Sequence, residues 1–193
     1  MNQFISFVQE LFPSISPYTA DKTREAISHY IKEKGKIETC SPYPFDYLTQ
    51  GDIISDMPFV FTDEDNLDNE FMGKGMLLTN TCDAERERQL LFAPVMHISV
   101  YLNDGLDEAN IRNNKYTKLY YLPSAVLKDH VVDLNIVNTY SRVLINKLLD
   151  QGIIKRVATL NSFGYYLLLA KLTVHFMRPE DYVTNISRET LGA

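Results

Sequence analysis

The sequence is poor in cysteine and has no long uninterrupted apolar run. Cys40 and Cys82 are the two cysteines among 193 residues, too few for a disulfide framework and in keeping with a reducing compartment. The most apolar stretch, residues 165–170, is closed by Lys171 and falls short of the ~18 residues that a membrane span needs. The first residues have no basic start, so they do not resemble a signal peptide. We therefore expect a cytoplasmic protein without membrane contact.

Internal repeats, low-complexity tracts and paired metal-ligand spacings are missing too. Cys40, Cys82, His97 and His130 show neither a CxxC nor an HxxxH pattern, so we expect no metal and no other cofactor. The chain is 45% hydrophobic and 23% charged, a composition typical of a folded core rather than a disordered chain. Its length fits a single domain over residues 1–193.

A net positive charge is also missing. The formal net charge is −6, which disfavours nucleic-acid binding by the chain as a whole. Residues 51–70 hold seven acids and no base, whereas residues 141–178 hold six bases and one acid, a net +5. Either the two segments face each other or are simply solvated, or the basic segment meets an anionic partner. The sequence leaves both interpretations open.

The N-terminal residues 1–35 are predicted to form a helical lead. Apolar residues at helical spacing predict one helix over residues 4–11. A second helix begins near Pro17, or one turn later at Thr19, and ends at Gly35 after two lysines.

The C-terminal residues 139–180 are predicted to be helical as well. One short helix is expected over residues 140–150, and a longer one follows the cap Ser162. An apolar stripe of 3.6-residue period predicts the face of the longer helix that packs on a sheet, with Lys171 and Arg178 outside it. The stripe consists of Phe163, Tyr166, Leu167, Ala170, Val174 and Met177.

The middle of the chain, residues 51–138, is predicted to be a β core. A loop is expected over residues 80–88 and a helical turn over residues 107–114. Short runs rich in Val, Ile, Phe and Tyr predict strands over residues 53–54, 57–62, 71–79, 89–102, 118–122 and 130–137. Strands at this spacing indicate a small antiparallel sheet or barrel, and hence the α+β class.

Part of this core resembles the small barrel of MazF/PemK-type toxins. The similarity rests on Gly51-Asp52-Ile53, on Pro58-Phe59, on an apolar strand that ends in Asn80, and on Leu90–Val95 after a polar loop. It covers about residues 51 to 100. The resemblance implies an SH3-like barrel flanked by the N-terminal and C-terminal helices, and metal-independent cleavage of RNA.

The residues that such toxins use are altered in this chain. The arginine position of the family falls at Lys74 or Gly75, and its threonine position falls near Val95 or Met96. Lys74 offers a positive charge without the bidentate fork of arginine. A shared barrel does not by itself carry an activity.

The segment between the two apolar runs holds the candidate catalytic residues. Cys82 is a candidate nucleophile, and His97 on the next strand is its candidate base. Asp83 or Asp52 would then orient the histidine. In the alternative interpretation, Cys82 is a small buried hydrophobe and Asp83 caps the loop through main-chain N–H groups.

Four further residues are candidate contacts to a substrate or partner. Lys74 and Asn80 flank the end of an apolar strand, and Arg86 and Arg88 lie in the loop that follows it. The alternating charges of residues 85–88 are typical of a solvated loop, and they also suit the rim of an interface.

Three functions are compatible with these features. We expect first a non-enzymatic interaction or regulatory component with a toxin-like barrel, which acts with a protein partner in a bacterial defence or toxin–antitoxin type system. The lack of a complete catalytic set and the uneven charge both favour this hypothesis. The alternatives are a metal-independent RNA endonuclease of the MazF/PemK type and a Cys82-dependent enzyme.

Overall fold

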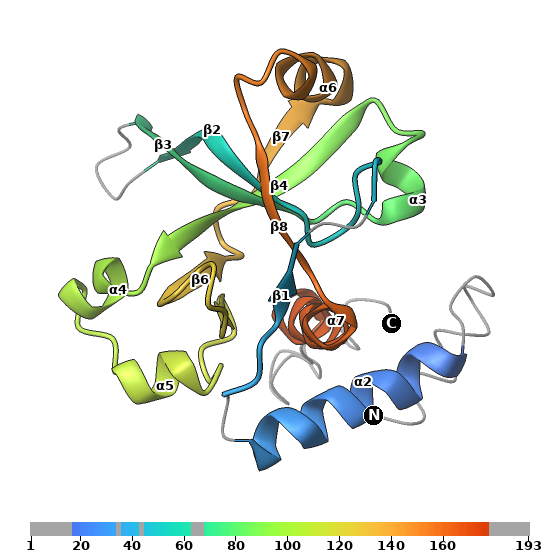
Figure 1. Ribbon diagram of the computed structural model, residues 1–193. Coiled ribbons are helices and arrows are strands. Elements are labelled where there is room, and N and C mark those ends of the chain that lie inside the picture. The colour runs from blue at the N-terminus through green and yellow to red at the C-terminus, as the bar shows by residue number, and fades with distance from the viewer. Residues whose placement is uncertain (1–16, 34–35, 43–44, 63–67, 178–193) are drawn as a thin grey trace, which may run out of the picture.

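The computed structural model describes residues 17–33, 36–42, 45–62 and 68–177. These residues form an antiparallel sheet with helices packed around it (Figure 1), which confirms the α+β class and the antiparallel sheet. The predicted helix over residues 4–11 and Arg178 lie outside the described residues.

Eight strands make up the sheet in the described part of the chain. Their order in space is β1-β8-β2-β3-β4-β6-β5, and β7 pairs with β4 on the edge that also holds β6. The bounds are β1 Cys40–Ser41, β2 Ile53–Thr62, β3 Asp68–Leu77, β4 Gln89–His97, β5 Leu119–Leu122, β6 His130–Asp133, β7 Asn138–Ser141 and β8 Arg156–Leu160. The sheet therefore extends beyond the predicted core, residues 51–138, at both ends, because β1 and β8 pair with each other and β8 pairs with β2.

The bounds of the helices are α2 Pro17–Lys32, α3 Thr81–Ala84, α4 Ser99–Asn103, α5 Glu108–Arg112, α6 Arg142–Asp150 and α7 Ser162–Met177. Helices α2, α6 and α7 lie close to their predicted bounds, whereas α3 and α4 were not predicted. The strand predicted over residues 89–102 is wrong beyond His97, since residues 99–103 form α4. Residues 99–103 favour strands, but they form a helix whose Tyr101 side chain is buried. Tertiary packing here overrides the local propensity.

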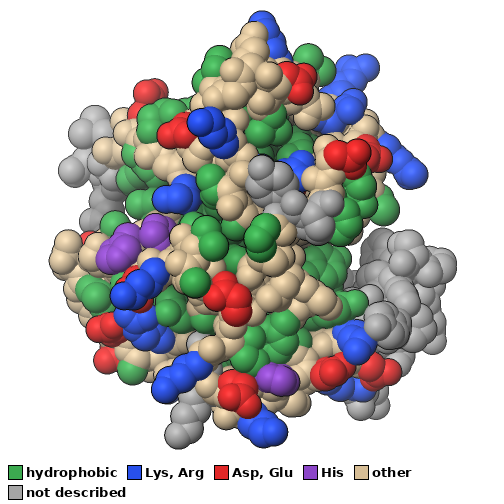
Figure 2. Space-filling model, in the orientation of Figure 1, with side chains coloured by type: hydrophobic (Ala, Val, Ile, Leu, Met, Phe, Trp, Pro, Cys, Tyr) green, Lys and Arg blue, Asp and Glu red, His purple; other side chains and the backbone are tan. Residues whose placement is uncertain are grey.

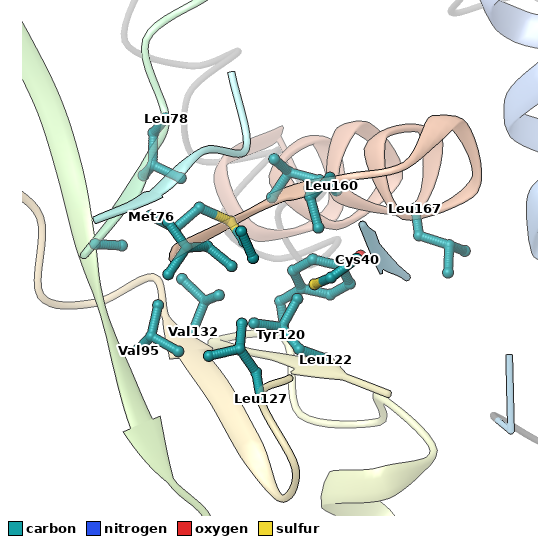
Figure 3. Packing of buried hydrophobic residues seen from close by; sticks show 14 of the residues in the cluster. Cys40, Met76, Leu78, Val95, Tyr120, Leu122, Leu127, Val132, Leu160 and Leu167 are labelled. Atoms are coloured by element: carbon teal, nitrogen blue, oxygen red, sulfur yellow. The ribbon is translucent and has the colours of Figure 1, made fainter. Parts of the chain in front are cut away.

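The curl of the sheet brings its two edge strands together. Thr39, directly before β1, donates its N–H to the carbonyl of Pro123, directly after β5, at 2.8 Å. Buried side chains from seven strands fill the space inside the curl. They include Cys40, Ile53, Met76, Ala93, Val95, Tyr120, Leu122, Val132, Ala158 and Leu160. Figure 3 shows part of this packing, including Cys40, Tyr120 and Val132.

A second core lies on the opposite face of the sheet. Met76 points into the curl, and its neighbour Leu77 points into this second core, as strand alternation requires. Phe59 and Phe92 contribute the largest rings, and α3 and α6 cover them. Gly75 separates the rings, because a Cβ there would lie 2.9 Å from the ring of Phe59.

Helix α7 packs against α2 and closes one end of the curl. The sequence predicted its bounds correctly, but its buried face matches the predicted stripe only in part. Phe163, Tyr166 and Leu167 pack on the core inside the curl. Val174 and Met177 are 43% and 53% exposed, whereas Lys171 is only 9% exposed. The buried residues of the helix are Gly164, Leu167, Leu168 and Lys171. Because α7 is apolar over most of its circumference, its pattern does not single out one face.

The contacts of Lys171 and Gly164 explain why this face of α7 points inward. The Lys171 ammonium group donates to the carbonyl oxygens of Asn114 at 2.8 Å and Tyr116 at 2.5 Å. Gly164 lies against the carbonyl of Thr39, where any Cβ would collide. The glycine is therefore required for close approach, and not merely tolerated in the first turn.

Candidate functional site

A buried ion pair joins the acidic and basic segments of the chain. The Arg156 Nε atom lies 3.2 Å from Oδ2 of Asp52, whose side chain is fully buried. The main-chain N–H and the hydroxyl of Thr49 also donate to this carboxylate, at 2.9 and 2.8 Å. At this position the two oppositely charged segments face each other inside the fold, as the first interpretation of the charge pattern expected.

The same arginine holds an aromatic segment at the surface. A terminal nitrogen of Arg156 donates to the carbonyl of Phe45 at 2.6 Å. The rings of Phe45 and Tyr47 lie 5.3 Å apart between centroids, and the two residues are 44% and 42% exposed. Two aromatic rings are thus kept together in a solvent-accessible position.

Helix α6 forms the facing wall. The Nε of Arg142 donates to the carbonyl of Glu87 at 2.8 Å, and its main-chain N–H donates to the carbonyl of Arg88 at 2.9 Å. Gly152 has a φ of 67° and ends the helix, since its N–H returns to the carbonyl of Leu149 at 3.0 Å. Both ends of α6 are therefore firmly fixed.

A cleft of about 830 Å³ lies between these walls, within the roughly 300–1,000 Å³ that is common for ligand sites. Its lining residues come from α3, α6, the start of β8 and residues 45–48. Its apolar floor is formed by Leu48, Ala84, Leu149 and Ile154. Its charged lining residues are Arg142, Lys155, Arg156, Asp46, Glu85 and Asp150, so both signs are equally represented. The arrangement can bind a ligand with apolar and charged groups of both signs.

The predicted catalytic residues do not line this cleft, and the structure does not bring them together. Cys82 lies in α3 and is exposed, so its interpretation as a buried hydrophobe is wrong. Its segment approaches β4 at Leu91, where the Leu78 N–H bonds the Leu91 carbonyl. His97 is six residues further along the strand, about 20 Å at 3.3 Å per residue. A Cys82–His97 pair therefore has no structural support.

The break between the two apolar runs is a short capped helix. The Asn80 side-chain oxygen accepts the N–H of Cys82 at 2.9 Å, so Asn80 is the cap that the sequence assigned to Asp83. The carbonyl of Asp83 accepts the N–H groups of Arg86 and Glu87, at 3.0 and 2.7 Å. These residues shape the turn that carries Ala84 into the floor of the cleft.

His97 belongs to a different part of the surface. It lies directly opposite His130 on β6, and their rings are 5.5 Å apart between centroids. Its Nδ1 atom is 2.8 Å from the Ser99 hydroxyl. Within the described residues, no group of three or more His, Cys, Asp or Glu side chains is placed to hold a metal ion.

The other candidate contacts are also separate from the cleft. Arg86 and Arg88 are exposed in the turn after α3. Lys74 is directly opposite Val95 on β4, so the structure does bring together the two altered positions of the toxin resemblance. Val95 is buried and has no hydroxyl group, and the pair offers no acid–base chemistry.

Sequence reasoning missed most of the residues that form the cleft. Phe45 and Tyr47 belong to a segment that contains prolines and has neither helical nor strand periodicity. Arg142 and Arg156 were visible only as part of a basic segment. The available signal in the sequence was the closely spaced aromatic pair Phe45 and Tyr47, since aromatic residues are common at binding sites.

Comparisons with known proteins add little to this description. No protein-family model matches the chain, and no curated protein matches it. Among solved structures, it is similar to the crystal structure of MazE-MazF (form II) from Deinococcus radiodurans, with a TM-score of 0.38 and 10% sequence identity. The match covers 69% of this chain and 99% of that chain. A likeness at this level assigns neither family nor activity.

The fold and the cleft together define an α+β protein with a ligand-sized site on its surface. No helix in the described ranges is both long and apolar enough to cross a bilayer. On the face shown in Figure 2, acidic and basic side chains are interspersed with hydrophobic ones. A broad basic surface of the kind that nucleic acids require is not visible among the described residues of that face.

Proposed function

We propose that this protein is a non-enzymatic binding component that holds a segment of a partner protein in the cleft between α3 and α6. One observation carries the proposal: an apolar floor, two paired aromatic rings and charges of both signs line the same cleft. Peptide segments combine apolar side chains with charges of both signs, and aromatic residues recur at the centres of protein interfaces.

The composition of the cleft favours a peptide over the alternatives. Its described lining contains no Cys, Ser, Thr or His side chain that would serve as a nucleophile or a neutral base. The three acids of the cleft offset its three bases, so the cleft lacks the net positive charge that attracts the phosphates of RNA, and the whole chain has a net charge of −6. These features disfavour a Cys-, Ser- or Thr-dependent enzyme and an RNA-binding site here.

The curled sheet is compatible with a variant of the SH3-like barrel that the sequence resemblance implied. Its support is the Thr39–Pro123 hydrogen bond, which joins residues that flank the two edge strands, and the interior formed by seven strands. A role in a defence or toxin–antitoxin type system stays a prediction, as does RNA cleavage.

Selection from a library of random peptides tests the proposed function. Peptides of about a dozen residues are selected on the intact protein, and their affinities are then measured for Phe45→Ala/Tyr47→Ala. We expect this variant to bind at least about tenfold more weakly. Phe176→Ala is the matched control, because Phe176 is a 63% exposed ring on α7, and its affinity should be unchanged.

Two outcomes would overturn the proposal. One is a peptide affinity that Phe45→Ala/Tyr47→Ala leaves intact, which would place the site elsewhere. The other is binding of a labelled single-stranded RNA that the double variant abolishes, because stacked aromatic rings also bind unpaired bases. That second result would support the RNA alternative.

A further inference from the structure

The hairpin formed by β2 and β3 projects beyond the rest of the sheet. β3 pairs with β2 along almost its full length, from Asp68 to Met76, but it pairs with β4 only from Lys74 to Leu77. Figure 1 shows the far half of the hairpin extending away from β4 at the upper left. The hairpin therefore has two outer edges of its own, one on each strand.

The outer edge of β2 is covered by side chains from β7. The Val60 N–H donates to Oδ1 of Asn138 at 2.7 Å, and Nδ2 of Asn138 donates to the carbonyl of Val60 at 3.0 Å. The hydroxyl of Tyr140 donates to the carbonyl of Pro58. These contacts occupy the main-chain groups that another strand would otherwise pair with.

The outer edge of β3 has no such cover. In an antiparallel pair, the main-chain N–H and C=O groups of two directly opposite residues either bond each other or both point away from the partner strand. Val60 and Pro58 point outward, so their partners Glu70 and Met72 do so as well. Within the described part of the chain, no strand or side chain contacts the outward main-chain groups of Glu70 and Met72.

The hairpin is nevertheless held firmly in place. On its inner face the rings of Phe59 and Phe71 stack at 5.5 Å between centroids, and the ring of Tyr140 meets Phe59 edge-on at 6.1 Å. On its outer face Met72 and Val60 are 66% and 44% exposed. A rigid strand with an open edge and exposed apolar side chains is the arrangement to which extended peptides add.

The charged residues of the hairpin indicate which kind of strand would pair with the open edge of β3. Asp68 and Glu70 are exposed on the outer face, and Asp56 is exposed at the base of the hairpin. Lys74 is the one base among the described residues of β2 and β3. Two copies of this edge would repel each other, because like charges on adjacent strands are destabilising. A strand with Lys or Arg opposite Glu70 would be attracted instead.

We propose that the open edge of β3 at Glu70–Met72 accepts an extended basic segment of a partner protein by strand addition. Main-chain hydrogen bonds to Glu70 and Met72 provide the attachment, and the acids select for basic side chains on the outer face. This surface is separate from the cleft, and the proposal holds whether or not the cleft binds a peptide.

A short synthetic peptide of alternating Lys and Val residues is the probe. Amide hydrogen exchange, followed by NMR, reports on individual main-chain groups. We expect the peptide to slow exchange of the Glu70 and Met72 amides at least about tenfold and to leave the Phe71 amide, which faces β2, unchanged. A peptide with Glu in place of Lys, and a peptide N-methylated at alternate amides, should both fail to bind.

Variants distinguish strand addition from general attraction between charges. Asp68→Lys/Glu70→Lys should weaken binding at least about tenfold, whereas Glu33→Lys/Asp104→Lys, an equal charge change on exposed residues elsewhere, should change it less than about twofold. Met72→Pro is a second variant that removes one outward N–H and leaves the β2 pairing intact. It should also prevent binding.

Three results would overturn the proposal. Equal weakening by the two charge variants would show unspecific attraction. Binding without slower exchange at Glu70 and Met72 would place the peptide elsewhere. Unchanged affinity of Met72→Pro would show that the edge is not used, and the acids would then serve only to prevent self-association.

Discussion

The interior of the curled sheet and the cleft on its other side use buried polar groups in opposite ways. Inside the curl, the ammonium group of Lys171 bonds two carbonyls and the hydroxyl of Tyr120 bonds the carbonyl of Gly164 at 2.9 Å. These contacts close the core. At the cleft, the Asp52–Arg156 pair extends to the carbonyl of Phe45 and keeps aromatic rings exposed. Buried charged groups hold α7 in place in one region and hold two exposed aromatic rings in place in the other.

The largest effect is expected inside the curl. Leu167→Asp should unfold the protein, because it places an unpaired carboxylate on the buried face of α7. Thermal melting followed by circular dichroism measures this. Val174→Asp is the control on the exposed face, and it should melt close to the unsubstituted protein. If both variants melted alike, the assignment of the inward face of α7 would be wrong.

The next effect concerns the ion pair beneath the cleft. Arg156→Ala leaves the fully buried Asp52 carboxylate without its cation and should lower the free energy of unfolding by about 3–5 kcal/mol. Urea denaturation measures the change. Lys155→Ala, at the exposed neighbouring position, should cost less than about 0.5 kcal/mol. A small loss in Arg156→Ala would show that the pair does not organise this region.

Lys171 should make the stability of the core depend on pH. Burial lowers the pKa of Lys171 to about 8, below its ordinary value near 10.4 in an unfolded chain. Between these values the unfolded chain binds more protons, so stability rises with pH from about 8 to about 10. We expect the protein to gain roughly 1–3 kcal/mol over this window relative to Lys171→Met.

Urea denaturation of both proteins at several pH values measures that difference. The comparison cancels the contributions of tyrosines, such as Tyr30, whose pKa burial raises to about 12. A parallel pH dependence of the two proteins would show that Lys171 is not desolvated in the folded state.

The smallest effect distinguishes the two cysteines. Cys82→Ser should change the melting temperature very little, because Cys82 is exposed. In the native protein, Cys82 should react with iodoacetamide at least about tenfold faster than Cys40, which is buried inside the curl. Burial also raises the pKa of Cys40 to about 11. Mass spectrometry of labelled peptides gives both rates, and similar rates would contradict this contrast between interior and surface.

The positions of helices and strands were predicted better than the side of each helix that points into the core. The bounds of α7 followed from the predicted cap and the apolar run, although the cap is Asn161 rather than Ser162, because Oδ1 of Asn161 accepts the Gly164 N–H at 2.9 Å. The inward face of α7 depends on the contacts of Gly164 and Lys171 with distant segments. β8 was missed because it is short and begins with a charged residue, and only its pairing with β1 and β2 makes it a strand.

The cleft was beyond prediction for a similar reason. Its residues come from three segments, 45–48, 84–85 and 142–156, which no local pattern connects. The one related feature visible in the sequence was the opposition of acidic and basic segments, which meet beside the cleft at Asp52 and Arg156. Complementary charge is a long-range signal, whereas periodicity reports only on one element at a time.

The most direct test of the proposed function is to map where a selected peptide binds. Amide chemical shifts are compared by NMR before and after addition of a peptide selected on the intact protein. We expect the largest chemical-shift changes to cluster at the cleft, at Tyr47, Leu48, Ala84, Leu149 and Ile154. Changes centred on Glu70 and Met72, or spread without a centre, would contradict the claim that the cleft holds the partner segment.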